Sequence, residues 1–200
     1  MKKFGSKKLF KLILLCLAAV MTIGLVSCES SEKLLSGLHY VEMEIENYGT
    51  IKLELNADEA PITVTNFVDL VKSGFYDGLT ITRVDTNFVI QGGDPKFNGS
   101  GEAAHTIKGE FAENGIQNNI SHVKGTISMA RGNEMDSASS QFFIMAADFT
   151  ELDGKYAGFG KVIEGIDVVD KINAEVKSEY YMGFLPFEDQ PKIISVKIVE

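Results

Sequence analysis

The alternation of apolar and charged residues between residues 41 and 55 places the strongest limit on the fold. An apolar residue alternates with glutamate over residues 41–46, and apolar residues alternate with lysine and glutamate over residues 51–55. The four residues 47–50, Asn-Tyr-Gly-Thr, are of types that favour a tight turn. Because successive side chains of a strand point to opposite faces, this pattern predicts an antiparallel hairpin with one buried face.

Two segments have the spacing of amphipathic helices. Pro61 suits the first position of a helix, residues 64–71 place apolar side chains three and four positions apart, and Gly74 suits the helix end. The second segment covers residues 166–173, where Ile, Val and Ile recur on one face. Each helix is expected to cover part of a sheet or barrel.

Short apolar segments separated by glycine-containing turns make up most of the remaining chain. The predicted strands cover residues 79–84, 88–91, 126–129, 141–145, 157–162 and 194–198. Many short strands with two helices indicate a mainly β protein, an antiparallel barrel or a sandwich with helical caps. Residues 99–124 form a long irregular excursion, and loops of that length are usually functional.

The first 27 residues have the composition of an export signal. Five lysines precede an apolar run at residues 12–26, which is shorter than the roughly 20 residues that span a bilayer. The run ends in Leu25-Val26-Ser27-Cys28, which resembles the lipobox of bacterial lipoproteins, whose cysteine is acylated and becomes the mature N-terminus. The alternative is an ordinary uncleaved anchor.

The lipoprotein interpretation divides the chain into three parts. Residues 1–27 are the signal peptide, residues 28–38 are the lipidated Cys28 and a flexible tether, and residues 39–200 are the folded domain. The protein is then expected outside the cytoplasm, anchored to a bacterial membrane by the lipid on Cys28.

Charge and cysteine content exclude further classes of protein. Removal of residues 1–27 takes away five lysines and no acidic residue, so the formal net charge changes from −9 to −14. Such a charge argues against a nucleic-acid partner. Cys16 would leave with the signal and Cys28 would carry lipid, so the domain has no disulfide and depends on its core for stability.

Several kinds of chemistry have no candidate residues in this chain. None of His39, His105 and His122 has a second ligand at zinc-like spacing, so no metal site is expected. No serine stands in a G-x-S-x-G motif, and the only mature cysteine is assigned to lipid. The stretch "NFVIQGGDP" at residues 87–95 lacks the phosphate-binding G-x-x-x-x-G-K pattern, which leaves a turn or one wall of an apolar site.

Four segments carry an unusual set of aromatic, amide and arginine side chains. They are "ITRVDTNFVIQGGD" at residue 81, "GTISMAR" at residue 125, "SSQFFIM" at residue 139 and "LDGKYAGFGKV" at residue 152. Taken singly, the arginine is most often a solvated strand residue and the phenylalanines are most often core. Together, in this order, they resemble the cyclophilin family of peptidyl-prolyl cis/trans isomerases over about residues 39–200.

The resemblance implies a closed eight-stranded antiparallel β-barrel capped by two α-helices, with the site in an outer groove and no cofactor. It implies that Arg83 is the catalytic arginine, with Gln91 beside it and Phe88 and Phe143 completing the catalytic set. The residues implied to bind substrate are Val89, Met129, Ala130, Gln141, Leu152 and Tyr156. Phe142 adjoins Phe143 on a strand, so it must point the other way into the core.

This chain departs from the family pattern at several positions. Glu151 stands where the best-known members carry a tryptophan that binds cyclosporin, and Val89 replaces a common methionine, so weak cyclosporin binding is expected. Tyr156 stands where many members have histidine and some bacterial members have tyrosine. Residues 131–138 differ in length from the animal-type loop, so no roles are transferred to them.

The implied function is isomerisation of Xaa-Pro bonds in unfolded or nascent exported polypeptides, by a protein expected to be monomeric. Arg83 would stabilise the twisted amide while an apolar pocket holds the proline ring. The alternative is a membrane-tethered peptide-binding or holdase module with little turnover, although pure binding does not require the arginine. A purely structural role is weaker, because the chain has no assembly repeats.

One geometric expectation concerns Phe88 and Gln91. They stand three residues apart, so a regular strand would send their side chains to opposite faces. A groove that both residues share therefore requires a bulge or bend between them.

Overall fold

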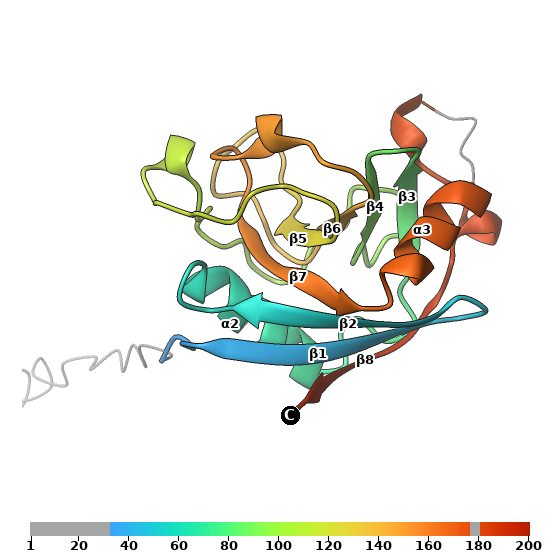
Figure 1. Ribbon diagram of the computed structural model, residues 1–200, viewed down its shortest axis with the longest axis horizontal. Coiled ribbons are helices and arrows are strands. Elements are labelled where there is room, and N and C mark those ends of the chain that lie inside the picture. Colours follow the sequence, from blue (N-terminus) through green and yellow to red (C-terminus); the bar gives the residue numbers. More distant parts are fainter. Residues whose placement is uncertain (1–32, 177–180) are drawn as a thin grey trace, which may run out of the picture. The chain divides into compact units, whose positions relative to one another are not determined.

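The computed structural model describes residues 33–176 and 181–200. In the unit formed by residues 34–200, eight strands make one sheet with the order β3-β4-β6-β5-β7-β2-β1-β8, and every neighbouring pair is antiparallel (Figure 1). The strands are β1 Leu38–Ile45, β2 Gly49–Asn56, β3 Ile81–Asp85, β4 Val89–Gly92, β5 Thr126–Met129, β6 Phe142–Met145, β7 Gly158–Glu164 and β8 Ile193–Val199.

The sheet is curled into a half-barrel that is not fully closed, so the prediction of a closed barrel is wrong in this respect. β3 and β8 are the two edge strands and do not pair as strands. They approach each other at one end, where Thr80 forms an isolated bridge with Lys192 and the Ile81 N–H donates to the Pro191 carbonyl (2.8 Å). The eight antiparallel strands and the mainly β class are confirmed.

The first hairpin forms as the alternation predicts. β1 and β2 pair along their whole lengths. Val41, Met43 and Ile45 are buried, whereas the intervening glutamates are half-buried or exposed. Asn47 in the connecting turn has a φ of 64°, a left-handed conformation that asparagine tolerates better than most residues.

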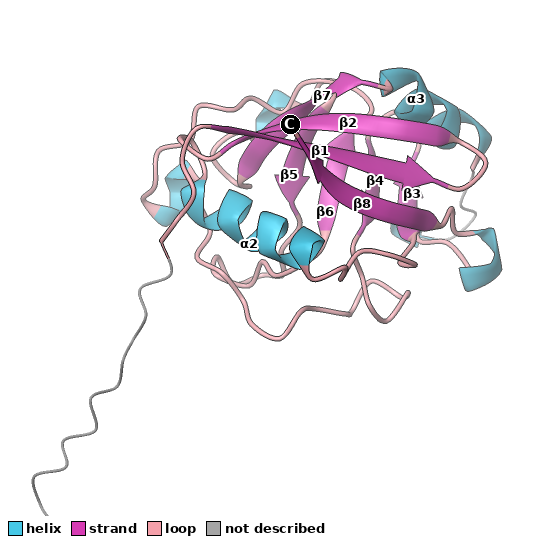
Figure 2. Ribbon diagram, turned by 90° about the horizontal axis from the view of Figure 1, so that it is seen from below, coloured by secondary structure: helices cyan, strands magenta, loops and turns pink. Residues whose placement is uncertain are grey.

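Two α-helices cover the sheet in the described part of the chain. α2 (Pro61–Lys72) packs against β8 and β2, and α3 (Ile166–Glu175) packs against β2, β3 and β4 (Figure 2). Phe67 on α2 meets the rings of Tyr76, Phe159 and Phe142 at centroid distances of 5.0, 5.2 and 5.8 Å. This aromatic contact joins the helix to the main core, and both helices are confirmed.

Two residues before β1 are also bound to the domain. The Leu35 N–H donates to Thr65 Oγ1 on α2 (2.9 Å), and the Gly37 N–H donates to Asp58 Oδ1 (2.8 Å). Leu35 and Gly37 are therefore fixed to the domain through their backbone N–H groups. The predicted signal and Cys28 lie outside the described residues, and within the described ones no helix is long and apolar enough to cross a membrane.

The N-terminus of α2 is capped from a distant part of the chain. The helix has no local side-chain cap. Instead the buried Glu110, in the long excursion, accepts hydrogen bonds from the backbone of Ile62 (3.0 Å) and Thr63 (2.8 Å) and from the Thr63 hydroxyl (2.7 Å). The carboxylate satisfies donors that a helix start leaves open and faces the positive end of the helix dipole.

Replacement of Glu110 tests this long-range cap. We expect Glu110→Ala to lower the free energy of unfolding by about 2–3 kcal/mol, because it leaves helix N–H groups without an acceptor, and Glu110→Gln to lower it by about half as much. Urea denaturation measures the change. Glu113→Ala, an exposed acid in the same excursion, is the control, and equal losses for Glu113→Ala and Glu110→Ala would contradict the capping role.

Candidate active site

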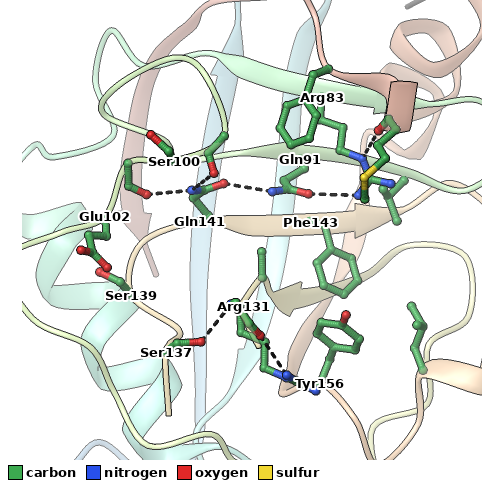
Figure 3. A pocket seen from close by; sticks show the side chains of 18 of the residues that line it. Arg83, Gln91, Ser100, Glu102, Arg131, Ser137, Ser139, Gln141, Phe143 and Tyr156 are labelled. Atoms are coloured by element: carbon green, nitrogen blue, oxygen red, sulfur yellow. Dashed lines mark hydrogen bonds between the residues drawn. The ribbon is translucent and has the colours of Figure 1, made fainter. Parts of the chain in front are cut away.

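A pocket of about 540 Å³ lies beside β3, β4 and β6 (Figure 3). Beneath it Val89, Phe143 and Met145 form a small apolar cluster, separate from the main core. The residues that line the pocket are Arg83, Phe88, Val89, Gln91, Gly99, Ser100, Gly101, Glu102, Ala130, Arg131, Gly132, Ser137, Ser139, Gln141, Phe143, Leu152, Tyr156, Met182 and Phe184.

Strand alternation explains why these side chains share one face of the sheet. On β4, Gln91 lines the pocket whereas Ile90 lies in the main core, and on β6, Phe143 lines the pocket whereas Phe142 lies in the core. The register sets Arg83 opposite Gln91 and Gln91 opposite Phe143. The three residues therefore form a row across neighbouring strands, and the assignment of Phe142 to the core is confirmed.

A chain of hydrogen bonds between amides crosses the pocket wall and ends on the arginine (Figure 3). Gln141 Nε2 donates to the carbonyl groups of Gly99 (3.2 Å) and Gly101 (2.7 Å). Gln91 Nε2 donates to Gln141 Oε1 (2.9 Å), and Arg83 Nη1 donates to Gln91 Oε1 (3.2 Å). Both glutamines are fixed in orientation because each is held at both its oxygen and its nitrogen.

Arg83 is held by acceptors from three segments. Besides Gln91, it donates from Nη2 to Asp85 Oδ2 (2.7 Å) and from Nε to the Met182 carbonyl oxygen (2.5 Å). These bonds use three of the five guanidinium N–H groups and leave two without an acceptor among the described residues. The guanidinium carbon lies 5.8 Å from the centre of the Phe88 ring, so a fixed cation borders an apolar wall.

The apolar part of the pocket is built from side chains of several segments. Phe143 and Tyr156 meet edge to face at 5.6 Å, and Ala130 and Leu152 pack against the same cluster. Such a slot suits a small apolar ring with a polar edge turned toward Arg83. In the described stretches of the chain, no group of His, Cys, Asp and Glu side chains could hold a metal ion.

The structure brings nine of the ten predicted catalytic and substrate-binding residues together. Those that line the pocket are Arg83, Phe88, Val89, Gln91, Ala130, Gln141, Phe143, Leu152 and Tyr156. Met129, the tenth, does not line the pocket, because its side chain is buried in the main core. Along β5, Ile127 and Met129 face the core, and Ser128 between them faces the other side.

Of the bulge or bend expected between Phe88 and Gln91, the structure has no bulge in β4 but a turn that contains Phe88. This strand pairs with β6 in regular register, and Phe88 lies in the turn before it, next to Asn87, whose φ is 58°. The turn brings Phe88 to the pocket. The register irregularity lies instead on β3, between Ile81 and Arg83.

Sequence reasoning missed the pocket residues that come from irregular segments. The excursion contributes residues 99–102, and the loop at residues 131–138, to which no role was transferred, contributes Arg131, Gly132 and Ser137. Ser139 follows directly after this loop. Met182 and Phe184 come from the segment between α3 and β8. Met182 is 99 residues from Arg83 in sequence, so no local pattern could pair the two.

Arg131 supplies a second guanidinium at the pocket. Its guanidinium carbon lies 4.9 Å from the centre of the Tyr156 ring and 5.1 Å from that of Phe111. Its Nε donates to the Lys155 carbonyl (3.0 Å). Cation–π contacts on two rings hold this side chain in place, so Arg131 fixes the position of Tyr156 in the pocket wall.

A buried histidine lies behind Phe143. His122 Nδ1 is 2.9 Å from Asp153 Oδ1, its Nε2 is 3.0 Å from Ser128 Oγ, and its ring stacks on Phe143 at 6.0 Å. His122 and Ser128 are fully buried, so these residues support Phe143 and cannot attack a substrate.

Burial and hydrogen bonding shift the ionisation of this pair. Burial lowers the pKa of His122, although its hydrogen bond with Asp153 and the charge of that carboxylate act in the opposite direction. Burial alone would raise the pKa of Asp153, but hydrogen bonds from Ser121 and His122 lower it below its usual value. At neutral pH the imidazole is therefore uncharged and the carboxylate ionised.

Comparison with known proteins gives matches over most of the chain. Residues 40–199 match the family described as "Cyclophilin type peptidyl-prolyl cis-trans isomerase/CLD". A peptidyl-prolyl cis-trans isomerase of Acinetobacter baylyi is 47% identical over 165 residues, which cover 79% of this chain and 84% of that protein. Peptidyl-prolyl cis-trans isomerase A of Dickeya dadantii is 42% identical over 158 residues, covering 76% and 80%.

Solved structures with the same fold include a Cryptosporidium parvum cyclophilin type peptidyl-prolyl cis-trans isomerase. Its crystal structure aligns with a TM-score of 0.71 at 26% identity and covers 82% of this chain and 98% of that chain. A crystal structure of the same protein in the presence of the dipeptide Ala-Pro has a TM-score of 0.71 at 27% identity, covering 80% and 99%.

The lowered pKa of His122 predicts how stability depends on pH. The folded state binds fewer protons at this site than the unfolded state, so the free energy of unfolding should fall as pH drops below about 6.5, the usual pKa of histidine. Urea denaturation at pH 7.5, 6.5 and 5.5 measures the fall. We expect His122→Gln to flatten it and His105→Gln, at an exposed histidine, to leave it unchanged; an undiminished fall in His122→Gln would contradict the assignment.

Proposed function

This chain belongs to the family of cyclophilin-type peptidyl-prolyl cis-trans isomerases, and from that premise we propose how its pocket catalyses the reaction and where the protein acts. The chain is a peptidyl-prolyl cis-trans isomerase, as are its relatives. In this proposal Arg83 stabilises the twisted Xaa-Pro amide, and the substrates are exported or surface polypeptides.

The reaction requires rotation about a bond with partial double-bond character. The barrier is about 18–20 kcal/mol, whereas the cis and trans forms of an Xaa-Pro bond differ by only about 0.5–1 kcal/mol. No covalent bond is broken. A catalyst must therefore bind the twisted amide more tightly than either planar form, and each 1.4 kcal/mol of this preference gives roughly a tenfold increase in rate.

The observation that carries the proposal is the guanidinium of Arg83, fixed by three acceptors and left with two N–H groups beside an apolar slot. In the twisted state the prolyl nitrogen becomes pyramidal and regains a lone pair. An N–H group of Arg83 donates a hydrogen bond to that lone pair, because a guanidinium offers donors in a fixed fork and no acceptor.

The rest of the pocket holds the proline ring while the acyl side rotates. Phe88, Phe143 and Leu152 supply apolar walls around the ring. Gln91 orients Arg83 without adding charge. Because the rotation breaks no covalent bond, the reaction needs no acid–base pair. One related crystal structure was determined in the presence of the dipeptide Ala-Pro, which supports a proline-containing ligand for this pocket.

Replacement of Arg83 tests the mechanism. We expect Arg83→Ala to lower kcat/KM at least about a hundredfold, on the scale of losing one transition-state donor, and Arg83→Lys to lower it at least about tenfold, because lysine lacks the fixed fork. Exchange spectroscopy on a proline peptide measures the rate, circular dichroism checks folding, and the exposed Lys161→Ala is the control. Wild-type activity in a folded Arg83→Ala protein would sink the mechanism.

The same experiment separates this mechanism from its rival, a peptide-binding or holdase module with little turnover. A holdase would bind proline peptides equally well with and without Arg83 and would show little isomerisation in the wild-type protein. Under our proposal each chain carries a complete pocket and works as a monomer.

The N-terminal sequence supports action outside the cytoplasm. A basic segment, a short apolar run and Leu25-Val26-Ser27-Cys28 together fit a lipoprotein signal. Lipid on Cys28 would anchor the isomerase to a bacterial membrane, where exported chains fold and where uncatalysed proline isomerisation takes tens of seconds.

Replacement of the two cysteines tests the anchor. We expect Cys28→Ala to abolish labelling by a palmitate analogue and to release the protein from the membrane fraction, because no thiol remains for acylation at that position. Cys16→Ala, within the apolar run, should leave both unchanged. If Cys28→Ala stayed in the membrane fraction and the wild-type protein took up no label, the lipoprotein assignment would be abandoned.

A further inference from the structure

Residues 182–184, which precede β8 in the chain, lie on one side of the pocket and are fixed to β3. Met182 and Phe184 both line the pocket. Arg83 forms an isolated backbone bridge with Phe184, and its Nε donates to the Met182 carbonyl. We call residues 182–187 the β3 strap.

The backbone of the strap turns sharply at the pocket rim. Met182 has a φ of 65° and Gly183 a φ of 79°, so two successive residues are left-handed. A Cβ atom at Gly183 would lie 2.5 Å from the Val84 carbonyl oxygen, so the chain approaches β3 as closely as glycine allows. Met182 is 54% exposed in this turn although it is a large apolar residue.

Four apolar side chains lie on or beside the strap: Met182 and Phe184 line the pocket, Phe187 follows three residues later, and Phe97 contacts Phe187. We call these four residues the apolar ridge. The Phe184 ring covers Gly99, where an added Cβ would lie 2.4 Å from it. Phe187 is 63% exposed and meets the Phe97 ring edge to face at 5.2 Å. Met182 and Phe187 are exposed, whereas Phe184 and Phe97 are half-buried. Exposed apolar side chains next to a binding pocket are typical of an interaction surface.

We propose that this ridge binds an apolar side chain that flanks the isomerised proline, so that the protein prefers prolines with hydrophobic neighbours. The inference rests on the proposed function, because the same polypeptide must occupy the pocket. The β3 strap then has two roles: its Met182 carbonyl positions Arg83, and its side chains select the substrate.

Continuity with the pocket identifies the occupant as an extended segment of an unfolded polypeptide. Met182 and Phe184 line both the pocket and the ridge, so a chain whose proline lies beside Arg83 passes directly over them. Unfolded proteins expose the hydrophobic residues that folding later buries, which makes such flanking residues common in these substrates.

A peptide series measures the preference. In Ala-Ala-Ala-Pro-Ala-Ala each alanine is replaced in turn by Phe or by Gln, which are both uncharged, so the strong negative charge of the protein does not bias the comparison. For the wild-type protein we expect kcat/KM to be about tenfold higher with Phe than with Gln at one or two flanking positions, as partial burial of one aromatic side chain would give.

Two variants each remove one apolar side chain of the ridge and keep the Met182 carbonyl that accepts the hydrogen bond from Arg83. Phe187→Gln and Met182→Asn should each reduce the Phe-to-Gln ratio to about twofold or threefold, through a higher KM for the Phe peptide. Asparagine tolerates a left-handed φ, and the substitution leaves the main-chain carbonyl in place. If Met182→Asn does not fold, Phe187→Gln alone tests the ridge. Ile194→Gln, at a 39% exposed isoleucine on β8 outside the pocket, should keep the wild-type ratio.

The outcomes separate this inference from the proposed function. If the wild-type protein isomerises no peptide of the series, the proposed function fails. If it isomerises all of them but the ratio is the same in the wild-type protein, Phe187→Gln and Met182→Asn, the ridge does not select substrate and the inference is overturned. Light scattering that shows a dimer lost in Phe187→Gln would also overturn it, by assigning the ridge to a second copy of this chain.

Discussion

The register of β3, β4 and β6 is the constraint on which the active site depends. It sets a cation, an amide and an aromatic ring side by side, with Arg83 opposite Gln91 and Gln91 opposite Phe143. A slip of one residue would turn these side chains toward the core. The other face of the same strands prevents that slip, because Ile90 and Phe142 are fully buried in the main core. Burial of the core and construction of the site are therefore fixed by one register.

The direction of the hydrogen bonds adds a second constraint. Arginine only donates, so Gln91 must turn its oxygen toward Arg83 and its nitrogen toward Gln141. Gln141 in turn must direct its nitrogen to the main-chain carbonyls of the excursion. A carboxylate at either position could accept but not donate, and the chain would break. This explains why both positions need uncharged amides. It also explains how Arg83 is oriented in a site whose reaction involves no proton transfer.

The part of the site carried by the sheet was predictable because its residues lie at short, regular spacings. Alternation alone separates Phe143 from Phe142, and the family resemblance gives their partners. Met129 was assigned to the pocket by the family resemblance, whereas alternation beside Ser128 sends it to the core. Closure of the barrel was overestimated because it depends on whether the edge strands β3 and β8 pair, and no local pattern contains that information.

The part of the site carried by loops was not predicted, because it is held by two buried carboxylates, one through local contacts and the other through contacts to a distant helix. Asp94 is fully buried and accepts backbone hydrogen bonds from Lys96, Asn98 and Gly99, which fixes the turn that brings Gly99 to the pocket edge. Glu110 holds the same excursion to α2. Composition would assign both acids to the surface, yet an ionised carboxylate is stable in the interior when backbone N–H groups surround it. With the chain's only two cysteines at residues 16 and 28, the domain has no disulfide to restrain its loops. These two carboxylates supply that restraint. The carbonyl groups of Gly99 and Gly101 depend on them for their position, and these carbonyl groups orient Gln141 and, through it, Arg83.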